Sequence, residues 1–304
     1  MILHHYPMSP FSEKIRLMLG YTGINWQSTI APEMPPRPGV DPLAGGYRRI
    51  PVAQQGADIF CDTRLISAEI ATLAAMPALD PGHCDEAALG FDAALEGDVF
   101  WACVASIPAR KILSQLFRKL GVRKAVRFIF DRAGMARAAK TRPMSPQQAA
   151  AVFERHLEQL EAQLSGSALF LFGDSPSHTD FAAYHTLWFQ HVVGELPLPA
   201  HLPQLLAWYE RISAFGHARS DELSVEQAFA AARHAEPREI PAAMTVDALI
   251  GEQVSVQPDD YALDSTGGTL VGVSDSRIII ARDSEVAGRV HVHFPAQGFT
   301  LVPS

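Results

Sequence analysis

The pattern of hydrophobic and polar positions in the first thirty residues predicts a strand, a helix and a second strand. The segment of residues 1–6 is short and rich in apolar residues, as expected for a strand. Ser9-Pro10 then opens a helical stretch, because proline suits the first turn of a helix, and Gly23 can end it. Residues 24–31 alternate well enough to form the second strand.

A hairpin and another helix are predicted next. Residues 32–47 carry five prolines and three glycines and are expected to be a loop. Ile50–Gln54 and Asp58–Cys61 then flank a short turn, and Asp62-Thr63 offers a helix N-cap before an apolar-periodic run. The order β-α-β, loop, β-β-α is the split arrangement of a thioredoxin-like domain.

In the rest of the chain, the period of the hydrophobic positions changes once. Residues 85–236 read almost wholly as helix, with capping boxes starting at Ser145 and Ser177. From residue 251 onward the period becomes two, and five short strands are expected. We therefore predict an α/β thioredoxin-like domain at 1–78, an all-α domain at 85–236, and a small all-β module, a barrel or sandwich, at 242–304.

Composition and charge narrow the class of partner. The 304 residues are 48% hydrophobic and carry a net charge of −8, which argues against a nucleic-acid or anionic-membrane partner. Three scattered cysteines form no CxxC pair, and no apolar run is long enough to span a bilayer. With no signal peptide visible, a cytoplasmic location is expected. The histidine spacings do not favour a metal site.

Four short motifs in this order resemble the cytosolic glutathione S-transferases, chiefly the serine-type and omega-like classes. They are Ser9-Pro10-Phe11-Ser12 with Arg16, then Arg49-Ile50-Pro51-Val52, then Asp62-Thr63, and the helical box Ser177-x-x-Asp180. The resemblance covers roughly residues 1–235. It implies a glutathione-binding N-terminal domain, an electrophile pocket built by the helical domain, and a homodimer.

Ser9 is the catalytic residue that the resemblance implies. At the N-terminus of the first helix its hydroxyl would donate a hydrogen bond to the glutathione sulfur and favour the thiolate. Lowering a thiol pKa from ~8.5 to ~6.5 needs ~2.7 kcal/mol, which one charged hydrogen bond plus the helix dipole can supply. The alternative is that Ser9 serves only as a helix cap.

Four further residues are expected to hold glutathione. The resemblance implies a cis peptide bond before Pro51 and antiparallel pairing of the Ile50 backbone with the cysteinyl part of the tripeptide. Thr63 would hold the γ-glutamyl carboxylate, and Asp62 the γ-glutamyl ammonium group; the alternative is a plain N-cap pair, which is compatible with binding. Arg49 either reaches a glutathione carboxylate or is a surface arginine.

Two other features leave alternatives open. Residues 110–142 hold eleven Lys and Arg residues against one acid, Asp131, and form either a solvated helical face or an entrance for an anionic ligand. Phe100 and Trp101 either line the apolar co-substrate pocket or pack in the core.

Ser9 and Ser12 stand where a redox protein would have cysteines, which disfavours thiol–disulfide exchange. Tyr6 is a weaker candidate than Ser9.

The function that the sequence favours is transfer of activated glutathione to a small electrophile. Two other classes remain: a glutathione-dependent lyase, isomerase or dehalogenase, and a non-catalytic scaffold with the same fold. The sequence does not name the electrophile, because the helical domain that would hold it carries the weakest resemblance.

Overall fold

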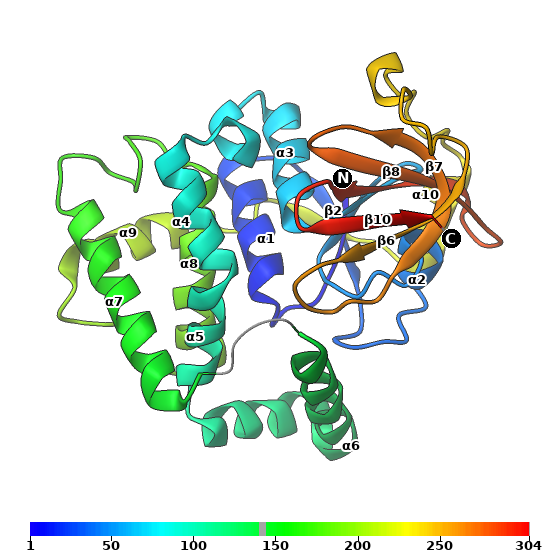
Figure 1. The fold of residues 1–304 in the computed structure, drawn as a ribbon. Coiled ribbons are helices and arrows are strands. Elements are labelled where there is room, and N and C mark those ends of the chain that lie inside the picture. Colours follow the sequence, from blue (N-terminus) through cyan, green and yellow to red (C-terminus); the bar gives the residue numbers. More distant parts are fainter. Residues whose placement is uncertain (140–143, 304) are drawn as a thin grey trace.

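A ten-stranded sheet and a lobe of helices lie side by side in the computed structural model, which describes residues 1–139 and 144–303 (Figure 1). The strands are β1 (Ile2–His5), β2 (Trp26–Ile30), β3 (Val52–Gln55), β4 (Asp58–Cys61), β5 (Ser220–Glu222), β6 (Gln253–Pro258), β7 (Thr266–Val273), β8 (Arg277–Ser284), β9 (Gly288–Pro295) and β10 (Phe299–Pro303).

The helices alternate with the early strands and then follow one another. They are α1 (Pro10–Thr22), α2 (Asp41–Ala44), α3 (Thr63–Ala74), α4 (Glu86–Glu96), α5 (Asp98–Ser106), α6 (Ala109–Ala138), α7 (Pro146–Leu164), α8 (His178–Trp188), α9 (Pro203–Ser213) and α10 (Val225–Arg233). Short helical turns are η1 (Pro77–Leu79), η2 (Pro81–His83), η3 (Phe189–Val193) and η4 (Ala242–Met244). In the part of the chain that the structure describes, no helix is both long and apolar enough to cross a membrane.

The N-terminal part has the predicted thioredoxin-like order. Strand β1 pairs in parallel with β2 and antiparallel with β3, and β3 forms the expected hairpin with β4. The expected proline-rich loop contains one unpredicted helical turn, α2, in which Pro42 occupies the first turn and Gly45 ends it with a φ of 65°.

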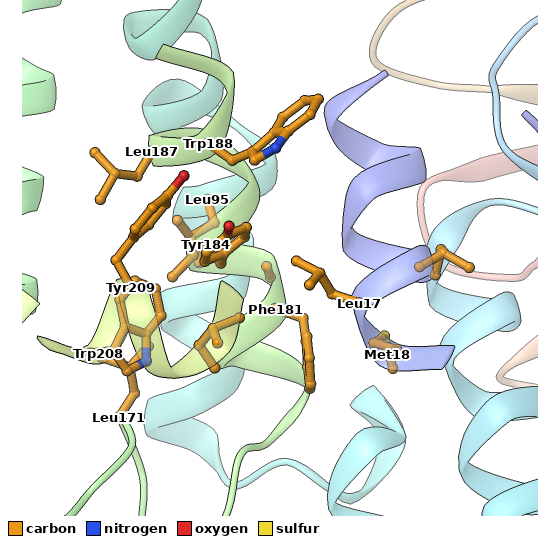
Figure 2. Close-up of a cluster of buried hydrophobic side chains, with 14 of the residues drawn as sticks. Leu17, Met18, Leu95, Leu171, Phe181, Tyr184, Leu187, Trp188, Trp208 and Tyr209 are labelled. Atoms are coloured by element: carbon orange, nitrogen blue, oxygen red, sulfur yellow. The ribbon is translucent and has the colours of Figure 1, made fainter. Parts of the chain in front are cut away.

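The helical lobe follows the predicted caps. Both capping boxes form, at Ser145 for α7 and at Ser177 for α8. Helix α6 bends at Gly121, whose φ of 72° is unfavourable for other residues. The lobe packs onto the sheet through α1: Figure 2 shows Leu17 of α1 pointing toward Phe181 of α8, and Met18 belongs to the same apolar cluster.

The C-terminal strands are present as predicted, but they do not close into a barrel or sandwich of their own. Strands β6 to β10 extend the thioredoxin-like sheet, in the order β10-β6-β7-β8-β9-β4-β3-β1-β2-β5. The join is a parallel pairing of β9 with β4, where Asp58–Phe60 lie opposite His291–His293. The physical reason is that β4 would otherwise leave its outer edge unpaired, and β9 satisfies it.

A buried polar pair fixes this join. His293 Nε2 lies 2.8 Å from Asp58 Oδ1, and both side chains are almost fully buried. The second oxygen of Asp58 accepts a hydrogen bond from the backbone N–H of Arg238, and the His293 ring stacks on Phe60 at 4.7 Å. Because buried polar groups are costly unless paired, this contact specifies the register of the two strands.

Three buried histidines make the stability of the fold depend on pH. Burial lowers the pKa of His4 and of His156 to about 4, and burial together with the nearby Arg16 lowers the pKa of His5 to about 3. Histidines of an unfolded chain titrate near ~6.5, so below that pH the unfolded chain takes up protons that the folded chain does not. Stability is therefore fully present above about pH 6.5 and falls as the pH drops toward 4.

We predict that His156→Phe weakens this pH dependence. The His156 ring lies against the rings of Phe91 and Phe153, so another aromatic ring suits the site. A pH of 5 lies about 1.5 units below the pKa of histidine in the unfolded chain. Keeping His156 neutral at that pH therefore costs about 2 kcal/mol of unfolding free energy. Between pH 7 and pH 5 the variant should lose about 2 kcal/mol less unfolding free energy than the wild type, measured by urea denaturation.

The exposed His234 provides the control for this experiment. His234→Gln should keep the wild-type pH dependence, because the substitution leaves the buried histidines His4, His5 and His156 unchanged. Equal losses in the wild type and in His156→Phe would contradict the assignment.

Candidate functional site

Strand direction determines which loops meet at the predicted site. Because β9 runs parallel to β4, the carboxyl ends of both strands lie at one edge of the sheet. Asp62 follows β4 there, and the β9–β10 turn follows β9. Strand β10 returns antiparallel beside β6, with Phe299 opposite Pro258, which brings the β6–β7 loop to the same edge. The β-module is thus positioned to contact the predicted glutathione site.

Two adjoining chambers occupy this edge. The first, which we call the polar chamber, measures about 250 Å³ and is lined by Pro51, Asp62 and Thr63 together with Asp259–Tyr261 and Gln297–Phe299 of the module. The second, the apolar chamber, measures about 450 Å³ and lies between the sheet and α5–α6. Four residues line both chambers: Phe11, Arg49, Ile50 and Tyr261.

Ser9 lines the apolar chamber close to the junction of the two chambers, which the four shared residues form. It is 1% exposed and is the N-cap of α1: its Oγ accepts the backbone N–H of Ser12 at 3.1 Å. The same Oγ lies 3.5 Å from the Ile50 carbonyl oxygen, to which it can donate only a long hydrogen bond. The cap therefore engages the lone pairs of Ser9, and its O–H is held weakly enough to turn toward a ligand.

The loop that carries Ser9 is fixed by Arg16. This buried guanidinium donates to the carbonyl oxygens of Tyr6 and Pro7 at 3.4 and 3.1 Å and pairs with Glu13 at 2.6 Å. The contacts explain why Arg16 belongs to the motif that opens α1. Tyr6 also lines the apolar chamber, as does Ser9.

The Ile50–Pro51 peptide bond is cis, as expected. Arg49, next to it, is not a surface arginine: its guanidinium pairs with Asp260, donates to the Tyr261 carbonyl oxygen at 2.7 Å, and lies 3.6 Å from Asp62. Burial lowers the pKa of Arg49, but the anionic forms of the surrounding tyrosines and carboxylates favour its charge more strongly and raise that pKa overall. Arg49 is a permanent cation between the two chambers.

Asp62 and Thr63 combine capping with exposure to the polar chamber. Asp62 Oδ1 accepts the Arg64 backbone N–H at 3.0 Å and so caps α3. The Thr63 Oγ1 accepts a hydrogen bond of 3.2 Å from the buried Lys14 ammonium. The hydroxyl of Thr63 thus keeps its own hydrogen for donation, beside the N-terminus of a helix, an arrangement that favours a carboxylate.

Two residues that sequence reasoning did not single out also belong to this site. Tyr47 lines the polar chamber, and its buried hydroxyl has no hydrogen-bond partner among the described residues. Tyr261 of the β6–β7 loop lies with its ring 4.1 Å from the Arg49 guanidinium and edge-to-face with Trp101 at 5.4 Å. Burial raises the pKa of Tyr261 to about 12, so the phenol is neutral near pH 7.

The apolar chamber includes Phe100 and Trp101, the two aromatic residues expected from the sequence. Of the basic residues in 110–142, only Arg132 is among those lining it; Lys140 and Arg142 lie outside the described residues. Other basic residues of this run form contacts away from the chamber; for example, Arg118 forms an ion pair with Glu195 at 2.5 Å. The run is therefore mostly a helix surface, with one arginine at the chamber.

One group of side chains in the described part of the chain has the composition of a metal site. Possible ligand atoms of Cys84, Asp92 and His178 lie within 4.8 Å of one another. Asp92 Oδ2 is 2.8 Å from His178 Nδ1, and burial raises the pKa of the Cys84 thiol to about 11. A metal would take Cys84 as the thiolate, so binding at this group would release the cysteine proton.

Comparisons with known proteins agree with this architecture. The family profile of the glutathione S-transferase N-terminal domain matches residues 3–78, and that of the C-terminal domain matches residues 132–211. A crystal structure of a GST-like protein from Pseudomonas syringae is 32% identical, with a TM-score of 0.79; the match covers 100% of this chain and 98% of that one.

Two less similar crystal structures are glutathione S-transferases. One from Sinorhizobium meliloti is 19% identical over 70% of this chain and 87% of its own, with a TM-score of 0.49. One from Methylobacillus flagellatus, solved with GSH bound, is 16% identical over 71% and 98%, with a TM-score of 0.47. No curated protein matches the chain. The domain profiles and the full-length relative establish that this chain belongs to the glutathione S-transferase family.

Proposed function

We propose that the chain binds glutathione in the polar chamber and transfers its thiolate to a small electrophile in the apolar chamber. The observation that carries the proposal is the junction of the two chambers, where Ile50 lines both and Ser9 lies within 3.5 Å of its carbonyl oxygen. A tripeptide that pairs with the Ile50 backbone would have its sulfur at this junction.

Each sequence-predicted residue then has a role in holding the tripeptide. The Ile50 backbone pairs with the cysteinyl residue, and Thr63 donates to the γ-glutamyl carboxylate. Asp62 and Arg49 balance the ammonium and carboxylate charges of the ligand. Tyr47 adds a buried hydroxyl donor to the same chamber.

The chemistry is nucleophilic attack by sulfur. Ser9 donates its O–H to the thiolate, and the helix dipole of α1 adds to this stabilisation. The sulfur electron pair forms the bond to an electrophilic carbon, and a leaving group departs with its own electron pair. Most of the acceleration comes from keeping the thiol ionised and holding it next to the electrophile.

The family resemblance also supports a homodimer, and a reducing, cytoplasmic location suits the cysteines. All three are free, and burial raises the pKa of the Cys61 and Cys103 thiols. Neither thiol is therefore suited to disulfide formation. Sedimentation of the purified chain tests the dimer.

We predict that Ser9→Ala lowers kcat/KM for conjugation of 1-chloro-2,4-dinitrobenzene about 10- to 100-fold. A hydrogen bond to a charged group is worth ~1.5–3 kcal/mol, and its loss also raises the pKa of the bound thiol. The measurements are steady-state conjugation, the ultraviolet titration of the bound thiolate, and glutathione binding by calorimetry.

The control separates catalysis from capping. Ser9→Ala also removes an N-cap, which costs ~1 kcal/mol of stability. Ser145→Ala removes the matching cap of α7, away from both chambers, and should lower stability by a similar amount while keeping the activity. Equal activity of Ser9→Ala and wild type would refute the assignment of Ser9. Glutathione binding without conjugation would favour a lyase, isomerase or dehalogenase, and no binding would favour a scaffold.

We predict that Tyr261→Ala weakens glutathione binding about 2- to 20-fold. The ring of Tyr261 covers the Arg49 guanidinium at 4.1 Å, and a cation–π contact is worth ~0.5–2 kcal/mol. Without the ring, Arg49 loses part of its fixed orientation in the polar chamber. Calorimetry gives the Kd of each protein.

Tyr261→Phe keeps the ring and serves as the matched variant. Its Kd should stay within about twofold of the wild type, because the phenylalanine face attracts a cation almost as well as tyrosine. Identical Kd values for the wild type and Tyr261→Ala would show that the module wall does not contribute to binding.

A further inference from the structure

The apolar chamber combines aromatic walls with a concentration of positive charge. Aromatic residues of α5, α6 and η3 form much of its lining. Yet Arg37, Arg48, Arg49 and Arg132 also line it, and no Asp or Glu side chain of the described residues does. A chamber meant only for a neutral apolar molecule gains nothing from four guanidinium groups, since their desolvation is costly.

Arg37 has a structural role in this arrangement. It is 2% exposed, and its guanidinium donates to the carbonyl oxygens of Pro32, Glu33 and Arg48. No carboxylate forms an ion pair with it among the described residues; Asp41 accepts only from its backbone N–H, at 2.8 Å. The charge of Arg37 therefore adds to the positive potential behind the chamber wall.

Arg132, in contrast, has donor capacity left. Its Nη2 donates to the Glu33 carbonyl oxygen at 2.8 Å, and its Nε lies 3.8 Å from Asp131. Among the described residues its Nη1 reaches only the Met135 sulfur, at 3.3 Å, and a thioether is a weak acceptor. A carboxylate oxygen in the chamber would be a far better partner for this N–H group.

Arg48, in the loop that precedes β3, also lines the apolar chamber. It pairs with Asp131 and lies 3.5 Å from Asp264, whose side chain is about half exposed. Its Nε is buried and has no hydrogen-bond partner within residues 1–139 and 144–303. Arg48 and Arg132 thus share one partly buried counter-ion, Asp131, and in the described part of the chain each retains an N–H group without a strong acceptor.

We propose that the apolar chamber accepts an electrophile with an aromatic or aliphatic body that carries one carboxylate, bound by Arg132 and Arg48. The inference rests on the proposed transfer function, because it names the substrate class of the same site. The aromatic walls would bury the body of the molecule, and the two guanidinium groups would hold its anionic end away from the thiolate. Such an arrangement also fixes which carbon faces the sulfur.

A pair of electrophiles that differ by one carboxylate tests the proposal in the full-length protein. These are 1-chloro-2,6-dinitrobenzene and 4-chloro-3,5-dinitrobenzoate, each attacked at the carbon that bears chlorine, with chloride leaving. After division by the uncatalysed rates, wild-type kcat/KM should favour the benzoate about 10- to 100-fold. In Arg132→Met this preference should fall about tenfold or more, and in Arg132→Lys by less.

Arg137→Met is the control, because Arg137 is an exposed arginine of the same helix and does not line the chamber. It should keep the wild-type preference. Equal selectivity in wild type and Arg132→Met, or a wild type that favours the neutral compound, would overturn the proposal.

A binding measurement keeps the inference testable if no transfer occurs. Calorimetry compares unreactive 3,5-dinitrobenzoate with 1,3-dinitrobenzene in the wild type and in both methionine variants, with glutathione present. Tighter binding of the benzoate that is lost only in Arg132→Met supports the anion site even if the transfer function fails. Equal affinities for the two compounds refute the anion site while leaving glutathione transfer to be judged by conjugation itself.

Discussion

The pairing of β9 with the edge of β4 is the contact on which the arrangement of the site depends. An unpaired edge strand leaves backbone donors and acceptors open, and β9 satisfies them over Asp58–Phe60. The buried pair of Asp58 and His293 selects this register over a neighbouring one. A slip by one residue would leave both polar groups buried without a hydrogen-bond partner. Because the pairing is parallel, the turns that follow β9 and β6 arrive where β4 ends. A module joined antiparallel would have directed them to the opposite edge.

The thioredoxin-like half could be predicted from the sequence because its signals are local. Ser9, Pro10 and Gly23 delimit α1, and Asp62 caps α3, so each element carries its own start and stop. The family resemblance, and not these caps, predicted that Ile50, Asp62 and Thr63 belong to one site, and all three line the polar chamber. The exact domain limits, and the roles of these residues toward a ligand, stay predictions.

What the sequence did not predict depends on contacts between distant segments. Period-two residues beyond 251 indicated strands, but strand propensity does not say whether an edge pairs within a module or with another sheet. The attachment of β9 to β4 and the position of Tyr261 on Arg49 both depend on that pairing. Arg49 shows the effect most clearly: alone it was equally a surface residue, and the β6–β7 loop makes it part of the site.

The module also explains how the two chambers can differ in character while sharing a wall. Tyr261 contacts Arg49 with its face and Trp101 of α5 with its edge, so one ring touches both the sheet side and the helical side of the site. In this position Tyr261 forms part of the wall of both chambers. The relative from Pseudomonas syringae aligns over the whole length of this chain, the module included. The module supplies Asp259–Tyr261 and Gln297–Phe299 to the wall of the polar chamber, so it packs as part of this architecture and is not a separate appended domain.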